Sequence, residues 1–356
     1  MKSPDTLRIA LDAMGGDHAP RNEVEGARKA LDRSGPSLGI ILVGDEAAIR
    51  AELSRQGSSE SPALSIVHAS QVITMEDPPT ASVKLKKDSS LAVGMRLHKE
   101  GRAEAFASAG NTGAVLSAST LILGRVRGVS RPTIGAFIPS EHGKCLVLDA
   151  GTNVDCRPRH LYEFAVMGSI YYRMICRKER PSVALLNVGE EKTKGTEAVL
   201  EAHRLLSGSA LNFIGNVEGR DILRSTADVV VCDGFVGNII LKFAESVPGF
   251  LKTHLRRFAE TSLTQKLQVG IAAPVLKKAL SDMDPNGEGG VPVLGVNGVS
   301  IIGHGSSSPR GIMNMILRAA EVAASRINQQ IEEELAGSAM QPTVDGGAAL
   351  AETGRI

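Results

Sequence analysis

The sequence predicts a layered α/β fold built on a doubly wound, largely parallel β-sheet. Short apolar runs recur along the chain, mostly separated by segments long enough to form a helix. This alternation is typical of parallel sheets with helices on both faces. The runs Leu146–Leu148 and Val183–Leu186 are continuous rather than alternating, as expected for strands covered on both sides. The expected strands are Leu7–Leu11, Gly39–Val43, Ala63–Val67, Ala105–Ser108, Cys145–Asp149, Ser182–Asn187, Asn212–Ile214, Val229–Cys232 and Val299–Ile302.

Composition narrows the class of protein. The chain has 356 residues, 42% of them hydrophobic, which is enough for one large domain or two lobes. A net charge of +1, no Trp and only three Tyr argue against a nucleic-acid partner. The cysteines have no short paired spacing, so we expect neither a zinc site nor disulfides, and a reducing cytoplasm fits best. No apolar run has the length of a signal peptide or a membrane span, so any membrane association should be peripheral.

One region departs from the strand–helix alternation. About residues 239–282 read as two consecutive helices, and we interpret them as a helical hairpin inserted into the α/β domain. One interpretation packs this pair onto the core or onto a dimer mate, and the other places an amphipathic hairpin on a membrane surface or around an acyl chain. The apolar stripes are Ile240, Phe243, Val247, Phe250, Leu251, Leu255 and Phe258, then Leu263, Leu267, Ile271, Val275 and Leu280. The basic fringe is Lys252, Arg256, Arg257, Lys266, Lys277 and Lys278.

The remaining C-terminal part divides into a loop, a helix and a tail. Met283–Gly290 reads as a loop that returns the chain to the core, and a last helix is expected from Pro309 to about Leu335. Residues 337–356 are small and polar without periodicity, so we expect a disordered tail. Residues 1–336 are accordingly predicted to form one catalytic α/β domain.

Small polar residues follow many of the expected strands. Because carboxyl ends of parallel strands meet at one edge of a sheet, these loops should line a ligand crevice there. The first loop, Asp12–Pro20, combines two glycines, an Asp–His pair and a helix start. The others are Ser108–Gly113, Asp149–Asn153, Asn187–Lys192, Asn216–Gly219, Cys232–Asn238 and Gly303–Ser307.

The chemistry that these loops support is limited by what they lack. There is no Gly-x-Ser-x-Gly elbow, no Walker loop and no Gly-x-Gly-x-x-Gly behind the first strand. Asp17 with His18, and Cys156 with His160, are too sparse to predict a metal centre, so we expect no metal and no cofactor. No covalent nucleophile stands out. A crevice of backbone N–H groups, Asn and Ser side chains and a few lysines suits an oxyanion such as phosphate.

These motifs together resemble one family. Asp12–Pro20, Lys86–Ser90, Ser108–Gly113, Asp149–Asn153, Asn187–Glu191, Gly215–Gly219, Cys232–Asn238 and Gly303–Gly305 are similar to the phosphate acyltransferases of bacterial phospholipid synthesis, the PlsX family. The resemblance covers roughly residues 7–335. It implies a homodimer with a fold similar to phosphotransacetylases and isocitrate-type dehydrogenases. It also implies conversion of fatty acyl-[acyl carrier protein] and inorganic phosphate to acyl phosphate and free carrier, which would supply a membrane glycerol-3-phosphate acyltransferase. The enzyme would be cytoplasmic, peripherally associated with an anionic membrane surface at the inner face of the cell membrane.

Phosphate near pH 7 is already a nucleophile, so we expect direct transfer with two main tasks, positioning of phosphate and stabilisation of the tetrahedral oxyanion. The backbone N–H groups of Gly110–Gly113 and Gly151–Asn153 are the expected anion donors. The expected catalytic residues are Asp17, His18, Lys86, Asn111 and Lys192. The expected substrate-binding residues are Gly15, Gly16, Ser89, Ser90, Gly110, Thr112, Gly113, Gly151, Thr152, Asn153, Asn187, Asn216, Asp233, Asn238 and His304.

Three other functions compete with this interpretation. A phosphate acyltransferase acting on short coenzyme A thioesters would share fold and chemistry, but the amphipathic hairpin favours a long-chain carrier substrate. A decarboxylating dehydrogenase of similar fold would need clustered carboxylates for magnesium, and no convincing set is present. A non-enzymatic lipid-binding scaffold would leave the polar loops without a purpose.

Overall fold

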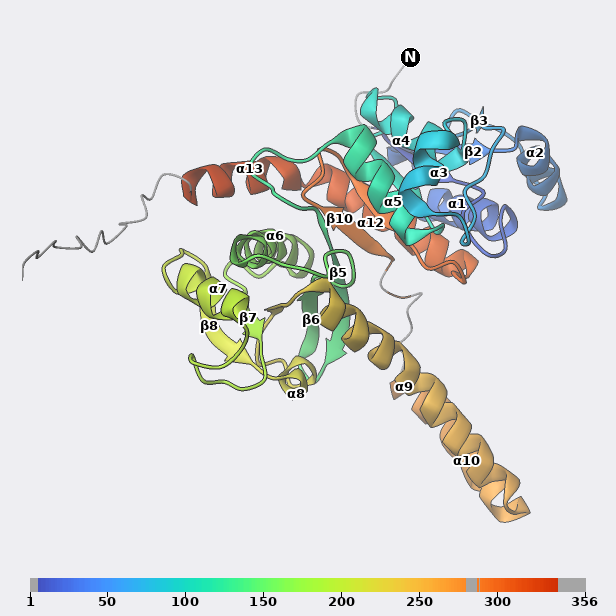
Figure 1. Cartoon of the computed structure of the whole chain (residues 1–356). Coiled ribbons are helices and arrows are strands. Elements are labelled where there is room, and N and C mark those ends of the chain that lie inside the picture. The colour runs from blue at the N-terminus through green and yellow to red at the C-terminus, as the bar shows by residue number, and fades with distance from the viewer. Residues whose placement is uncertain (1–5, 280–286, 288, 339–356) are drawn as a thin grey trace, which may run out of the picture.

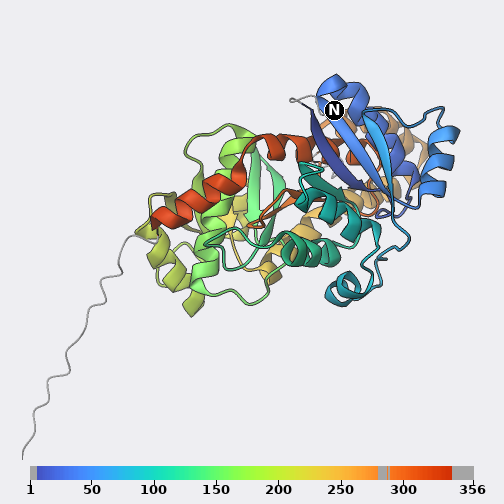
Figure 2. The same ribbon diagram turned by 90° about the horizontal axis from the view of Figure 1, so that it is seen from above.

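The computed structural model describes residues 6–279, 287 and 289–338, and it confirms the layered α/β architecture. Eleven strands form one continuous sheet in the order β3-β2-β1-β4-β11-β10-β5-β6-β9-β7-β8. The outer strands on both sides pair in parallel, whereas β11, β10, β5 and β6 pair antiparallel to one another in the middle. The sheet therefore joins two parallel halves, which we call the N-terminal and C-terminal lobes (Figures 1 and 2).

The N-terminal lobe holds the first parallel half of the sheet between two helical layers. Helices α1 and α12 cover one face, and α4 and α5 cover the other. Gly26 permits close packing of α1, because a Cβ there would lie 2.5 Å from Ile312 Cβ. The strands are β1 (Leu7–Asp12), β2 (Leu38–Gly44), β3 (Leu64–His68), β4 (Ala105–Ser108) and β11 (Ser300–Ile302), and the helices are α1 (Arg21–Ser34), α2 (Glu46–Arg55), α3 (Pro79–Leu85), α4 (Ser90–Lys99), α5 (Thr112–Ala118) and α12 (Pro309–Ala324).

The C-terminal lobe repeats this arrangement with fewer helices. The long helix α6 (Pro158–Cys176) packs on β6, β9 and β7, and α7 (Glu197–Ser207) continues that layer. Helices α8 (Gly219–Leu223) and α9 contact β5, which belongs to the central part of the sheet. The strands are β6 (Gly143–Leu148), β7 (Ser182–Leu186), β8 (Asn212–Val217) and β9 (Val229–Val231).

Two central strands were not predicted. They are β5 (Thr133–Ser140) and β10 (Val291–Leu294). Both carry a proline, Pro139 and Pro292, which is typical of a strand edge rather than a sheet interior. Pairing outweighs this local preference, since β5 forms a six-residue antiparallel register with β6 from Gly135↔Leu148 to Ser140↔Gly143.

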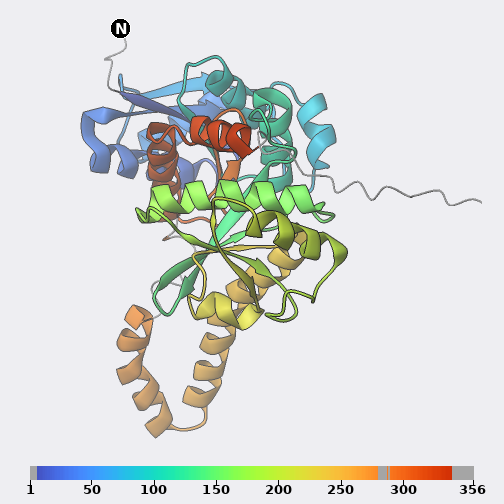
Figure 3. The ribbon, with the colours of Figure 1, turned by 90° about the vertical axis from the view of Figure 1, so that its left-hand side faces the viewer.

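The expected helical hairpin is present and projects away from both lobes. It consists of α9 (Gly234–Glu260) and α10 (Leu263–Ala279), which lie side by side (Figure 3). Helix α9 begins at Gly234, earlier than predicted, with Asp233 as its N-cap. The interpretation that packs the pair onto the core is wrong, because Phe243, Phe250 and Leu263 are 72%, 62% and 87% exposed. The predicted C-terminal end of the hairpin lies outside the described residues.

The chain ends with two helices in place of the single one predicted. Arg326, with a φ of 55°, separates α12 from α13 (Ile327–Ser338). Helix α12 packs on the N-terminal lobe and α13 packs on α6, so the two helices span both lobes (Figure 2). Helix α13 includes Gly337 and Ser338, which the predicted tail had contained, and the rest of that tail lies outside the described residues. In the described part of the chain, no helix has the length and apolar character that a membrane crossing demands.

Candidate active site

A cleft of about 1300 Å³ lies between the lobes and is polar on one side and apolar on the other. Its polar side is formed by several of the strand-end loops of both lobes, whereas the loops Asp12–Pro20 and Asn187–Lys192 do not line it. Its apolar side is formed by β5, α8 and the first half of α9. The predicted site residues that line it are Thr112, Gly113, Gly151, Thr152, Asn238 and His304, and further polar or charged lining residues are Ser117, Lys242, Glu245, Ser306 and Ser307.

The Gly15–Gly16 turn packs against loops of the same lobe and does not itself line the cleft. A Cβ on Gly15 would lie 2.8 Å from Gly110 N, and the Asp17 amide donates to the Gly305 carbonyl at 2.8 Å. Asp17 and His18 are exposed beside this contact. The turn therefore sets the position of the loop that carries His304, one residue before Gly305.

Two carboxyl groups lie buried under this turn, and both have raised pKa values. Burial raises the pKa of Asp12, although Ser90, Ser108 and the Met14 amide donate to it. Burial also raises the pKa of Glu23 to about 7, helped by the nearby charges of Asp12 and Asp17 and opposed by backbone amides. Glu23 Oε2 is buried with no hydrogen-bond partner. The turn thus packs on two neighbouring carboxyl groups, Asp12 and Glu23, and ionisation of both at once is unfavourable.

The Gly151–Asn153 loop closes around Asp149, a fully buried residue that we did not single out from the sequence. Asp149 Oδ1 accepts from the amides of Gly151 (2.9 Å) and Thr152 (2.8 Å), and Oδ2 accepts from Asn153 N at 2.8 Å and Nδ2 at 2.6 Å. The Thr152 hydroxyl also donates to Oδ2. The amides expected to hold phosphate or the oxyanion therefore already hold an internal carboxylate.

Helix α9 starts directly against this loop. A Cβ on Gly237 would lie 1.8 Å from the Asp149 carbonyl oxygen, so only glycine fits there without a backbone shift. Asp233 caps the helix by accepting from Val236 N at 2.9 Å and faces a smaller cavity of about 250 Å³, whereas Asn238 faces the large cleft. The loop thus fixes the origin of the hairpin.

Lys86 and Asn111 do not face the cleft. Their side chains contact the neighbouring segment, residues 72–77. Lys86 Nζ bonds the Val72 carbonyl at 2.9 Å and pairs with Asp77 Oδ2 at 2.5 Å, which lowers the pKa of Asp77. Asn111 Oδ1 caps α5 through Ala114 N, and its Nδ2 lies 3.2 Å from the carbonyl oxygens of Thr74, Met75 and Asp77. Both residues fix the segment that leads to Pro79, a lining residue of the cleft.

Three further amide and hydroxyl groups of the N-terminal lobe are occupied inside the protein. Gly110 N donates to Ser108 Oγ at 3.0 Å, so it is not available as an anion donor in this arrangement. Ser89 is buried and caps α4 through Ala92 N. Ser90 is buried against Asp12. These residues support the loops instead of facing a substrate.

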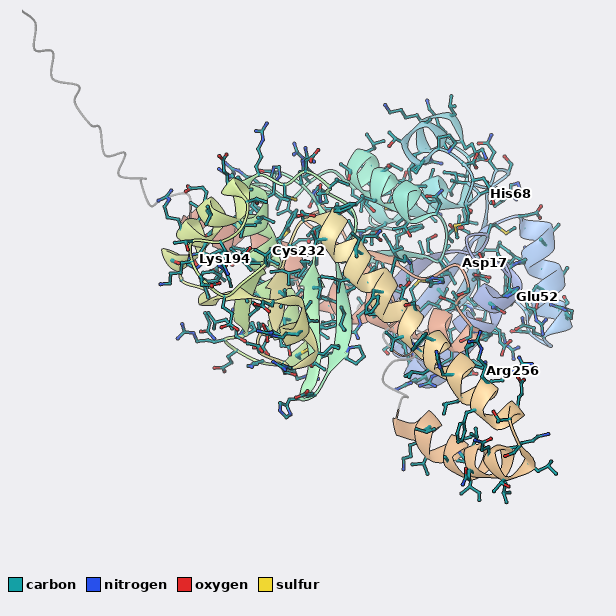
Figure 4. All side chains as sticks on the ribbon, turned by 60° about the horizontal axis from the view of Figure 1, so that its bottom comes forward. Asp17, Glu52, His68, Lys194, Cys232 and Arg256 are labelled. Atoms are coloured by element: carbon teal, nitrogen blue, oxygen red, sulfur yellow. The ribbon has the colours of Figure 1, made fainter. Side chains whose placement is uncertain are left out.

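A third group of predicted residues lies away from the cleft, at the edge strand β8 and its neighbour β7. Asn187 Nδ2 bonds the Lys194 carbonyl at 2.8 Å, and Asn216 Nδ2 bonds the Glu191 carbonyl at 3.0 Å. Lys192 is exposed in the same loop. Figure 4 shows Asp17 and Lys194 on different lobes. The structure does not bring this group together with the cleft residues.

His304 is the imidazole that lines the cleft. Its Nδ1 lies 2.8 Å from Ser306 Oγ and accepts from Ser306 N at 3.3 Å. Because the amide needs the lone pair of Nδ1, the neutral ring carries its hydrogen on Nε2. The ring can therefore donate to an anion. Ser306 and Ser307 belong to a loop that the sequence singled out, although neither was chosen as a site residue.

Thiol and metal chemistry have little support among the described residues. Burial raises the pKa of Cys156 and of Cys145 to about 12 and that of Cys232 well above its usual range. No group of three or more His, Cys, Asp or Glu side chains with the geometry of a metal site occurs in the described ranges.

Comparison with known proteins identifies the family. Residues 7–330 match the family described as "Fatty acid synthesis protein". A phosphate acyltransferase from Heliobacterium modesticaldum is 47% identical over 331 residues, which cover 93% of this chain and 98% of that protein. A phosphate acyltransferase from Chlorobaculum parvum is 46% identical, with 91% and 98% covered. The chain belongs to the phosphate acyltransferase family. It is thus an acyltransferase of lipid synthesis, as the motifs had indicated.

The fold of this chain is similar to that of solved phosphotransacetylase structures. A phosphotransacetylase from Streptococcus pyogenes superposes with a TM-score of 0.60 at 16% identity, covering 92% of this chain and 95% of the other. A phosphotransacetylase from Staphylococcus aureus gives 0.57 at 15% identity, with 89% and 94% covered. At this identity the likeness concerns the fold alone, and it agrees with the predicted architecture.

Proposed function

We propose that the protein transfers a fatty acyl group from acyl carrier protein to inorganic phosphate, releasing acyl phosphate and free carrier. The main support is the two-sided cleft. Its polar loops suit phosphate and the thioester, whereas its apolar wall includes Ile134, Ile222 and Phe243 and suits an acyl chain. A short coenzyme A thioester would leave that wall uncovered by substrate, which favours the long-chain carrier substrate.

The transfer is direct in this proposal. An oxygen of the phosphate dianion attacks the thioester carbonyl, the C–S bond breaks, and the hydrogen of the phosphate ends on the pantetheine thiol. His304 donates Nε2–H to the phosphate or the oxyanion, and the hydroxyls of Thr112 and Ser307 complete the polar side. No cofactor enters the reaction. The Asp17 amide keeps the adjacent loop in place, and the side chains of Asp17 and His18 are the candidates for proton transfer.

The exposed hairpin has a proposed role in assembly and location. Its apolar stripe is covered in the working enzyme by a second copy of the chain and by the inner face of an anionic membrane, with the enzyme itself cytoplasmic. The support is the exposure of Phe250, Leu263 and Leu267, which do not line the cleft, together with the basic residues on the same helices. The acyl phosphate would then be released close to a membrane glycerol-3-phosphate acyltransferase.

Thiol release is the experiment that tests the reaction. Palmitoyl carrier protein and palmitoyl coenzyme A are each incubated with the enzyme, with and without phosphate. Phosphate-dependent release that is much faster from the carrier supports the proposal. Release that ignores phosphate contradicts it, and preference for short coenzyme A thioesters would support the rival transferase.

Two substitutions separate direct transfer from an acyl-serine intermediate. His304→Ala removes a donor to developing negative charge and is expected to lower kcat at least about 100-fold. Ser306→Ala keeps the imidazole and is expected to cost less than about tenfold, because the phosphate itself is the nucleophile. Steady-state rates at saturating substrate measure both. Complete loss in Ser306→Ala, with a trapped acyl-enzyme in the parent protein, would overturn direct transfer.

A further inference from the structure

Three exposed arginines lie together beside the Gly151–Asn153 loop, and we call Arg131, Arg157 and Arg159 the arginine patch. They come from two segments, one leading into β5 and one leading into α6. Asn153 Nδ2 joins these segments by donating to the Pro132 carbonyl at 2.8 Å.

A buried carboxylate stabilises the same junction. Glu163 accepts from Ser130 N at 2.7 Å and from Ser130 Oγ at 2.8 Å, and it also receives Arg159 Nε at 2.8 Å. The patch therefore rests on a fixed backbone, and its position does not depend on a flexible loop.

The patch is electrostatically unbalanced. After burial, the charges of Arg131, Arg157 and Arg159 lower the pKa of His160, and only Glu163 opposes them, so all three positive charges act on this one ring. Glu163 is buried and already occupied. Within the described residues no ion pair joins Arg131 or Arg157 to a carboxylate, and the exposed acid nearby in the sequence is Asp155.

The arginine patch lies close to the cleft, so a partner protein bound to it would be next to the cleft. Thr152 lines the cleft, and Arg157 follows five residues later, so a fully extended chain between them spans at most about 18 Å. Thr152 is held by Asp149, and Asn153 links the loop to the patch. A protein seated on the arginines would have its prosthetic arm directed across this loop toward the polar side of the cleft.

We infer that the arginine patch is the docking site of the acidic acyl carrier protein. This inference rests on the proposed function. Planar guanidinium groups on a fixed backbone suit the carboxylates of an acidic protein surface. The hairpin is a poorer docking site, because Arg256 lies far along α9, beyond the part of the helix that lines the cleft (Figure 4). The basic residues of the hairpin are assigned to anionic lipid.

Charge reversal with a substrate that lacks a protein tests the docking site. The double variant Arg131→Glu/Arg157→Glu leaves the Glu163 contacts intact and is compared with the control Arg256→Glu/Arg257→Glu. For palmitoyl carrier protein, the patch variant is expected to raise KM at least about 30-fold with kcat nearly unchanged, and to lose most of the salt dependence of KM. Its rate with palmitoyl-pantetheine, which carries no acidic surface, is expected to match that of the parent enzyme.

The control variant should keep the parent KM for palmitoyl carrier protein and lose binding to vesicles containing anionic lipid. An unchanged carrier KM in the patch variant overturns the inference. Equal loss with palmitoyl-pantetheine, or a raised KM for phosphate, also overturns it and assigns the patch to the cleft itself. If the double variant misfolds, the single Arg131→Gln variant is measured in its place. Failure of phosphate-dependent release in the parent enzyme would instead refute the proposed function.

Discussion

Each lobe has an Asp–Ala dipeptide at the carboxyl end of one strand, and the two loops that follow behave differently. Strand β1 ends at Asp12, which Ala13 follows, and β6 ends at Leu148, directly before Asp149–Ala150; a glycine-containing loop follows each dipeptide. Asp149 is satisfied by three backbone amides and two side chains. Asp12 receives mainly hydroxyl donors and lies near a second carboxyl group, Glu23.

The difference shows how one sequence signature serves two purposes. The Asp149 loop uses a carboxylate as an internal anion, which fixes the backbone that lines the cleft and starts α9. The Asp12 loop instead covers two buried carboxyl groups with raised pKa values, which lie under its glycine turn. In both lobes the strand-end aspartate organises the site from below, and the groups that face the cleft come from residues that follow it.

Among the substitutions that test this comparison, removal of the Asp149 carboxylate is expected to change the stability of the protein most. Asp149→Ala would leave the buried amides around it without their acceptor, at a cost of at least about 4 kcal/mol in the free energy of unfolding. Urea denaturation measures this loss. A variant that unfolds within 1 kcal/mol of the parent protein would show that water replaces the carboxylate easily.

In contrast to Asp149→Ala, the substitution Glu23→Gln is expected to raise the free energy of unfolding. The folded-state pKa of Glu23 is raised to about 7 from 4.5, so its contribution favours folding at low pH and is lost as pH rises through the interval between these values. Glutamine does not titrate, so the variant should be about 2 kcal/mol more stable than the parent protein at pH 8. Chemical denaturation at pH 5 and pH 8 provides the measurement.

A matched control distinguishes this effect from a general loss of negative charge. Glu25→Gln lies on the same helix, where Glu25 pairs with Lys29 on the surface. It should change stability by less than about 0.5 kcal/mol at either pH. A pH-independent gain in Glu23→Gln would contradict the raised pKa.

Asp12→Asn should have the smallest effect. Asparagine keeps an acceptor for Met14 N, and its amide can donate to Ser108 Oγ, which retains a lone pair for it. The expected change in unfolding free energy is less than about 1 kcal/mol at pH 7. If Asp12→Asn were as damaging as Asp149→Ala in the same denaturation assay, the two aspartates would share one role and the comparison would fail.

Much of the fold was predictable from local patterns, because continuous apolar runs and helix periodicity reflect burial directly. The two central strands were missed because each contains a proline, Pro139 or Pro292, which is unusual inside a sheet, and because the pairing of β10 with β5 joins distant segments. The convergence of strand-end loops followed from sheet geometry. The duties of Lys86, Asn111 and the Gly151–Asn153 amides did not, since their internal partners Asp77, Thr74 and Asp149 are chosen by the folded chain.

The pairing of β11 with β4 has a consequence for synthesis of the protein. Ser300 aligns with Phe106, and α12 packs on α1, so the N-terminal lobe gains its last strand and part of one helical layer from the end of the chain. On the ribosome, β4 keeps an open edge, and the face of β1 that α12 covers stays exposed until nearly the whole chain has emerged. The sheet of the C-terminal lobe needs no segment earlier than β5, so this lobe can complete its folding first. Completion of the N-terminal lobe, which was synthesised earlier, is then the final, nonlocal step of folding.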